Sequence, residues 1–305
     1  MKTKIIMMSA LLALVATGCT KDDNQKVNDG RIKIFAENMT AASNGSKLLI
    51  DPSDMAMEWL AGEKIKVNDE VYTIASNGEG GYTIGSTESP LADDEGFYYA
   101  LYPGGDDFNG NDVTISGTNA APVMTLNNLV INMHTDGTHD VAFPMGVKVA
   151  STATEMVFKH LTAGFKLSLK TTTGTVTVDK LKVYVYGEDA VGTVNTGDGV
   201  SYKVKWNSEG MMPMVPVGEV GGITDRDLSY GSEMVFDMKT DGSAGVVFNT
   251  TAKSFCIPVT LTTVKRITVV GYNEGNQVFA KTSAMASHVE LGRHVMYPVK
   301  TIAIN

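Results

Sequence analysis

Apolar and polar residues alternate along many short stretches of this chain. The clearest are residues 32–34, 64–67, 165–170, 181–186 and 202–206. A period of two places apolar side chains on one face and polar ones on the other, as a half-buried strand requires. Segments rich in Gly, Asn and Asp separate these stretches, and no long segment has the 3.6-residue period of a helix. The pattern predicts an all-β fold of the sandwich or barrel class.

The length and the turn-rich segments predict two domains. A chain of 305 residues exceeds the usual size of one small domain. A stretch rich in Gly, Asp and Asn covers residues 187–199, directly after the alternating run that ends at Tyr186. We therefore expect an N-terminal domain over residues 31–190 and a C-terminal domain over residues 191–305.

The first 18 residues have the parts of an export signal. Lys2 and Lys4 precede an apolar run of about 12 residues, shorter than the roughly 20 that span a bilayer as a helix. The run ends in Val15-Ala16-Thr17-Gly18-Cys19, which resembles a lipobox. We expect cleavage between Gly18 and Cys19 and lipid on Cys19 that tethers the chain to a membrane. The alternative is an ordinary secretory signal with an incidental cysteine.

Residues 19–30 are polar and contain no aromatic residue, so we expect a flexible tether. The run Lys21-Asp22-Asp23 resembles the surface-export signal of Bacteroidetes lipoproteins, although an ordinary charged tether is the alternative. Together with Cys19, it predicts an outer-membrane lipoprotein exposed on the cell surface.

Charge and cysteine content narrow the possible partners. The chain has 25 basic and 34 acidic residues. Removal of the signal takes away Lys2 and Lys4, which leaves 23 basic residues and a net charge of −11. Such a surface argues against a nucleic-acid partner. With Cys19 carrying lipid, only Cys256 remains, which excludes a disulfide within the mature chain. Cys256 lies in an apolar run and is expected to be a buried small hydrophobe.

The search for catalytic and metal-binding patterns finds little. The five histidines lack the spacing of a zinc site, and the chain has no Gly-x-Ser-x-Gly motif. His134 and His139 flank a polar segment, for which a solvated loop is the simplest interpretation. His160 follows Phe158 on an expected core strand and is interpreted as a hydrogen-bonded structural residue. We expect no enzymatic activity, no metal and no cofactor.

Four motifs occur in an order that resembles a known family. They are Trp59-Leu-Ala-Gly62-Glu63-Lys-Ile65, Tyr99-Ala-Leu-Tyr102-Pro103, Met156-Val-Phe158-Lys-His160-Leu161 and Leu291-Gly-Arg293-His294-Val-Met-Tyr297. In this order they resemble the fimbrillin family of Bacteroidales, the Mfa-like fimbrial lipoproteins. The resemblance implies two tandem transthyretin-like β-sandwiches and a role as a structural or adhesive subunit of a cell-surface fimbria.

The same resemblance implies assembly by strand exchange, in which a protease removes the first strand and a neighbouring subunit fills the groove. Here the first strand would be residues 31–37, and the candidate processing sites are Arg31 before it and Lys47 after it. Residues 295–304 would have to serve as the donor.

The lipobox and the family resemblance predict three kinds of partner. They are other fimbrial subunits or a second copy of this chain, the membrane through Cys19, and a receptor on a host or bacterial surface. Shaft, tip, anchor and accessory roles remain open. The alternative function is a surface lipoprotein that binds a glycan or a protein outside any fibre.

Overall fold

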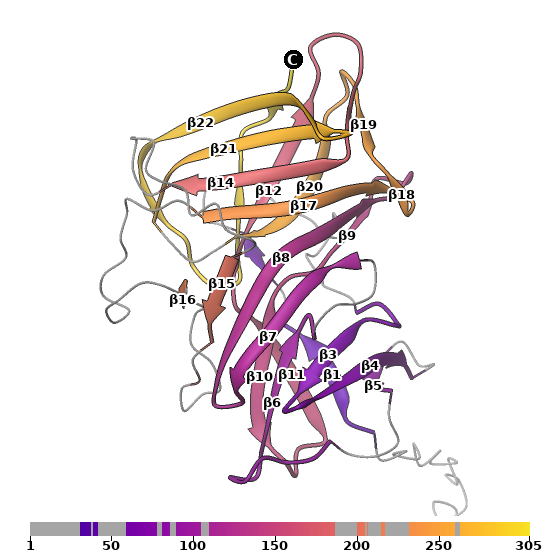
Figure 1. Ribbon diagram of the computed structural model, residues 1–305, viewed down its shortest axis with the longest axis vertical. Coiled ribbons are helices and arrows are strands. Elements are labelled where there is room, and N and C mark those ends of the chain that lie inside the picture. The colour runs from indigo at the N-terminus through magenta and orange to yellow at the C-terminus, as the bar shows by residue number, and fades with distance from the viewer. Residues whose placement is uncertain are drawn as a thin grey trace, which may run out of the picture.

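Strands form the regular structure of the part of the chain that the computed structural model describes. The described residues are 31–37, 39–41, 59–77, 81–85, 90–104, 110–186, 200–204, 206, 215–216, 232–259 and 263–305. They contain 24 strands and no helix (Figure 1). The predicted all-β fold is confirmed. The described residues therefore include no candidate membrane-spanning helix.

Seven strands of the first half close into a barrel, in the lower half of Figure 1. In order around the barrel they are β1 (Lys33–Ala36), β11 (Glu155–His160), β10 (Met145–Ala150), β6 (Phe97–Tyr102), β3 (Lys64–Val67), β4 (Glu70–Ser76) and β5 (Tyr82–Ile84). Trp59 fills the interior and is 4% exposed. Its ring centroid lies 4.9 Å from that of Tyr102 and 5.3 Å from that of Phe158, both edge-on.

A separate ten-stranded sheet extends from beside the barrel into the upper half of the molecule (Figure 1). Its main order is β16 (Val215–Pro216), β15 (Val200–Lys203), β8 (Ala121–Met133), β17 (Ser232–Thr240), β14 (Lys180–Tyr186), β21 (Thr263–Asn273) and β22 (Asn276–Glu290), while β7 (Asp112–Thr118), β9 (His139–Val141) and β18 (Ser243–Ala244) pair beside this path. The first part of β8 pairs with β7 and β15 and its last part with β17 and β9. This long strand therefore joins the two halves of the sheet.

A second sheet packs behind the upper part of the first, where Figure 1 shows β12 and β20 crossing behind β14 and β17. Its strands are β2 (Thr40–Ala41), β23 (Val295–Pro298), β12 (Ala163–Lys170), β20 (Lys253–Val259) and β24 (Ile302–Ala303). A separate pair joins β13 (Val176–Val178) to β19 (Val246–Phe248). Buried residues of the two large sheets, among them Leu167, Phe255, Val183 and Phe236, belong to one continuous core. This arrangement is a sandwich.

Strand pairing crosses the expected domain boundary at residue 190. β12 pairs with β20, β23 and β24, and β14 pairs with β17 and β21. Both strands thus precede residue 190 and pair with strands that follow it. The division into domains 31–190 and 191–305, and their tandem arrangement, stay predictions.

Candidate functional site: the first strand and its contacts

The strand β1 closes the barrel at the beginning of the described chain. It runs parallel to β11, with four residue pairs from Lys33–Glu155 to Ala36–Phe158. On its other side it runs antiparallel to β5, with two pairs. The strand expected over residues 31–37 therefore forms at its centre, and four residues complete the ring of strands.

Side chains of β1 alternate between the barrel interior and the outside. Ile34 is 1% exposed, and Ile32, which precedes the strand, is 5% exposed. Phe35 points the other way and is 44% exposed, next to its register partner Val157 on the outer face. The barrel core thus holds this segment by two isoleucines spaced two residues apart, as in recognition of an added strand.

A network of charges and hydrogen bonds fixes the end of β1. Arg293 Nη1 donates to Glu37 Oε2 at 2.5 Å and to the His160 carbonyl at 3.2 Å. His160 Nε2 lies 2.8 Å from the Glu37 carbonyl oxygen, which can only accept, so this nitrogen carries the proton. Two of the motifs found in the sequence, around His160 and around Arg293, therefore meet at the residue that follows β1.

The protonation states of this network follow from burial and from charge. Partial burial raises the pKa of Glu37, but the hydrogen bond and positive charge of Arg293 outweigh it, and the net pKa is lowered. Burial lowers the pKa of His160 to about 4. His160 is consequently neutral at pH 7, and the interpretation of it as a hydrogen-bonded structural residue agrees with its contacts.

Beyond Glu37 the chain passes from the barrel to the second sheet. Met39 is 2% exposed and packs in a cluster with Phe143, Cys256 and Met296. β2 then pairs in parallel with β23, Thr40 with Val295. The approach is close, because a methyl group at Gly164 would come within 2.6 Å of Met296 and 3.1 Å of Met39. We call residues 31–41 the N-terminal staple; of these, residues 31–37 contact the barrel and residues 39–41 contact the second sheet.

Most of the expected processing and lipidation residues lie outside the described part of the chain. Gly18, Cys19 and Lys47 belong to this group, so lipidation, signal cleavage and processing at Lys47 stay predictions. Arg31 is described, is half-buried and lies two residues before β1. A cut after Arg31 would leave β1 attached to the chain, whereas a cut after Lys47 would separate the whole staple from it.

The expectation of a solvated loop around His134 and His139 is wrong for His139. This residue lies on β9 and is 8% exposed, and its Nε2 accepts the backbone N–H of Cys256 at 2.8 Å. Burial lowers the pKa of His139 to about 4 and raises that of the Cys256 thiol to about 12. Cys256 is therefore the buried, unreactive hydrophobe that its apolar neighbours indicate.

His134 lies between two aspartates. Its Nε2 is 2.8 Å from Asp140 Oδ2, and its Nδ1 is 3.1 Å from Asp241 Oδ1. Burial lowers the pKa of His134, but the hydrogen bonds and charges of Asp241 and Asp140 outweigh it and raise the net pKa. Within the described residues, no group of three or more His, Cys, Asp or Glu side chains could hold a metal ion.

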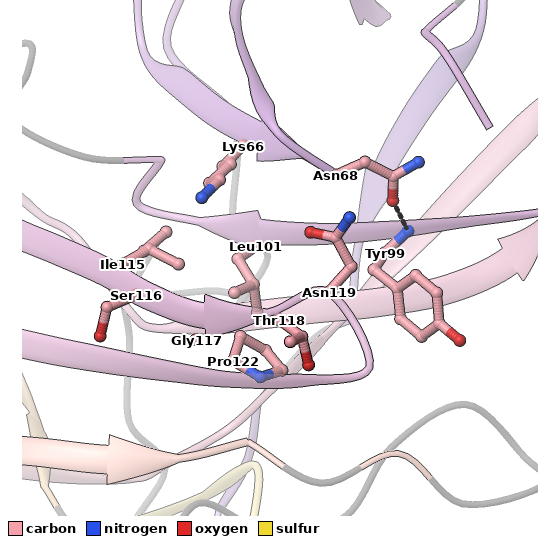
Figure 2. Close-up of a pocket in the computed structure, with 10 residues that line it drawn as sticks. All are labelled: Lys66, Asn68, Tyr99, Leu101, Ile115, Ser116, Gly117, Thr118, Asn119 and Pro122. Atoms are coloured by element: carbon pink, nitrogen blue, oxygen red, sulfur yellow. Dashed lines mark hydrogen bonds between the residues drawn. The ribbon is translucent and has the colours of Figure 1, made fainter. Parts of the chain in front are cut away.

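A small cavity lies between the barrel and the turn that joins β7 to β8 (Figure 2). Asn68 organises one wall, since its Oδ1 accepts the Tyr99 N–H at 2.9 Å and its Nδ2 donates to the Leu91 carbonyl at 2.6 Å. The free space is about 10 Å³, room for about one water molecule. The cavity marks where the hairpin packs on the barrel and is too small for a ligand.

Comparisons with known proteins show low similarity. No family model matches the sequence, and no curated protein is significantly similar to it. A candidate cell adhesion protein from Bacteroides ovatus is 14% identical with a TM-score of 0.39, covering 90% of this chain and 94% of its own. A candidate cell adhesion protein from Bacteroides fragilis is 12% identical with a TM-score of 0.34, and the match covers 90% of this chain and 93% of that protein. A fimbrial protein from Bacteroides ovatus is 11% identical with a TM-score of 0.28, over 90% of this chain and 50% of its own. Similarity at this level does not identify the family of the chain.

Proposed function

We propose that this chain is a structural or adhesive subunit of a cell-surface fimbria, a member of the fimbrillin family, exported as a lipoprotein through Cys19 and assembled by strand exchange. The observation that carries the proposal is the position of β1, a four-residue strand that closes the barrel. We assign no enzymatic activity to the chain.

Loss of the N-terminal staple would leave two receptive surfaces. In the barrel, the edges of β11 and β5 would lose their partner, and the positions of Ile32 and Ile34 would become open pockets. In the second sheet, the edge of β23 that pairs with β2 would be uncovered. A strand from a neighbouring subunit gains main-chain hydrogen bonds and apolar burial at such surfaces.

The N-terminal mass of protein recovered from the cell surface distinguishes a chain that keeps β1 from a chain that has lost it. A chain that starts at lipidated Cys19 retains β1 and fits an anchor or accessory subunit. A chain that starts after Lys47 lacks β1 and fits a polymerising subunit, and Lys47→Gln should then block both the cut and the fibre. Fibres formed by subunits that all retain residues 31–41 would contradict strand exchange at this groove.

Membrane attachment is tested separately with Cys19→Ala. We expect this variant to leave the membrane fraction, because the lipid supplies about 0.8 kcal/mol per buried CH₂ group. If the variant stays in the membrane fraction as fully as the chain that keeps Cys19, the lipoprotein assignment is refuted, and strand exchange is not affected.

A second experiment tests the groove directly. The chain with Cys19→Ser is treated with trypsin under native conditions, and a labelled peptide of residues 31–41 is then added. We expect the peptide to bind only after removal of the staple, and the same peptide with Ile34→Asp to bind far more weakly. Equal binding of the two peptides would mean that the barrel pocket does not select the strand.

A further inference from the structure

A cavity of about 500 Å³ opens on the outer face of the ten-stranded sheet, remote from the first strand. Its lining comes from the residue before β14, from β14, β17, β18 and β21, and from the turn after β21. It consists of Asp179, Lys180, Lys182, Asp237, Met238, Lys239, Ala244, Tyr272 and Gly275. Figure 1 shows β17, β14 and β21 side by side at this place. The volume lies within the roughly 300–1,000 Å³ of small-molecule sites.

The floor of the cavity contains one row of side chains across three neighbouring strands. Lys180 on β14 is the register partner of Asp237 on β17 and of Tyr272 on β21, so an acid, an amine and an aromatic ring lie side by side. Lys180 Nζ is 3.6 Å from Asp237 Oδ1. The other oxygen of Asp237 accepts a hydrogen bond from Asn128 at 2.8 Å. Contacts within the protein therefore hold the aspartate of this row beside its lysine.

Two tight turns beside the cavity are fixed by hydrogen bonds. In one of them Glu274 and Gly275 have positive φ angles of 51° and 79°, and the Glu274 N–H donates to Asp179 Oδ2 at 2.6 Å. In the other, the Gly242 N–H donates to Asn132 Oδ1 at 2.8 Å. A ligand entering between these turns meets a preformed site, which limits the entropy cost of binding.

The lining chemistry narrows the ligand class. Five of the nine lining residues are charged, which disfavours an apolar ligand. The three lysines are offset by two aspartates, and Lys182 also bonds to Glu233 at 2.8 Å, so a phosphate or another strong anion finds no net positive site. What fits is a neutral molecule that both donates and accepts hydrogen bonds at closely spaced positions.

We infer that this cavity binds a neutral saccharide. Each sugar hydroxyl donates one hydrogen bond and accepts others, which the Lys180–Asp237 pair complements by offering a donor beside an acceptor. The apolar C–H face of a sugar ring packs on an aromatic ring, and Tyr272 supplies one at the end of the same row. In a fimbria this site would supply receptor contact, but the inference does not depend on the chain forming a fibre.

The test uses the mature chain with Cys19→Ser and an immobilised panel of saccharides. The panel contains neutral oligosaccharides that end in glucose, galactose, mannose, fucose or an N-acetylhexosamine, together with sialylated and sulfated oligosaccharides and inorganic phosphate as a competitor. We expect at least one neutral saccharide to bind. Tyr272→Ala and Lys180→Met should each weaken that binding about tenfold or more.

Two further variants separate loss of the site from loss of the fold. Tyr272→Phe keeps the ring and should keep most of the affinity. Tyr72→Ala removes a half-buried tyrosine from β4 in the barrel and should leave binding unchanged. Thermal unfolding of each variant shows whether it is folded.

Three results would overturn the inference. The first is absence of binding to every neutral saccharide at millimolar concentration. The second is binding that Tyr272→Ala and Lys180→Met, both folded, leave undiminished. The third is binding restricted to the sialylated or sulfated members and abolished by phosphate, which would mean an anion site. Each result would leave the strand-exchange proposal unaffected, because none of these variants touches the N-terminal staple.

Discussion

The substitution Ile34→Ala measures how firmly the barrel holds its first strand. Ile34 is 1% exposed, and its register partner Met156 is fully buried. Truncation to alanine removes three carbon atoms from the core, a transfer loss of about 2.4 kcal/mol at about 0.8 kcal/mol per group. The cavity left behind adds to this loss, and we expect a total of about 3 kcal/mol within the range of about 2–5 kcal/mol for such truncations.

The same free energy sets how often β1 leaves the barrel. If the other strands keep their places when β1 detaches, a loss of about 3 kcal/mol raises the population of the open state by about two orders of magnitude. Local opening of this kind exposes backbone amides to exchange. The faster exchange should be confined to residues 31–37 and to their partners on β11 and β5.

The neighbouring residue provides a matched control. Phe35 is larger than Ile34 but points outward and is 44% exposed, so Phe35→Ala should change stability by no more than about 0.5 kcal/mol. Urea unfolding measures the global effect, and hydrogen exchange followed by mass spectrometry measures the local one. If Phe35→Ala cost as much as Ile34→Ala, or if Ile34→Ala left both observables unchanged, the orientation of β1 and the role of Ile34 as an anchor would be refuted.

Three further predictions follow from the contacts around the staple and the second sheet. A double-mutant cycle with Glu37→Gln and Arg293→Met should give a coupling free energy of about 1–2 kcal/mol at pH 7, measured by urea unfolding. A coupling near zero would mean that the ion pair does not contribute to the free energy of unfolding. Stability should fall as pH drops from 6.5 to 4, because the pKa values of His139 and His160 are lowered to about 4 and the unfolded chain takes up protons that the folded chain refuses. His160→Gln should flatten this pH dependence. His134→Gln should lower stability below pH 6.5 and have no effect above the raised pKa of His134. A His134→Gln effect that appears only at high pH would refute the assigned protonation states. In the Cys19→Ser chain, Cys256 should resist iodoacetamide until urea unfolds the protein, and rapid alkylation of the native form would contradict its burial.

Local alternation was sufficient to predict several strands. Residues 181–186 and 64–67 alternate in the sequence and form β14 and β3 almost as expected, because one face of each strand packs in the core. Alternation carries no information on pairing, however. The parallel pairing of β1 with β11 joins segments far apart in the sequence, and the sequence alone does not state which strand closes the barrel.

Polar sequence context misled the interpretation of His139. Its neighbours Thr138 and Asp140 are polar, which is typical of a solvated turn. The residue is nevertheless buried, because β9 packs against β20 and presents His139 to the Cys256 amide. The saccharide site was also missed, since Asp237, Lys180 and Tyr272 become neighbours only through the pairing of three strands. Such sites can be predicted only when the register is known.

The binding requirements of the groove can be read from the staple that fills it. Ile32 and Ile34 enter the barrel two residues apart, and Ile302 and Ile304 have the same spacing in the run expected to act as donor. Ile304 is itself 1% exposed, and Asn305 accepts the Thr172 N–H at 2.5 Å, so this run already completes its own sheet beside β12. A subunit that donated it would have to break these contacts first.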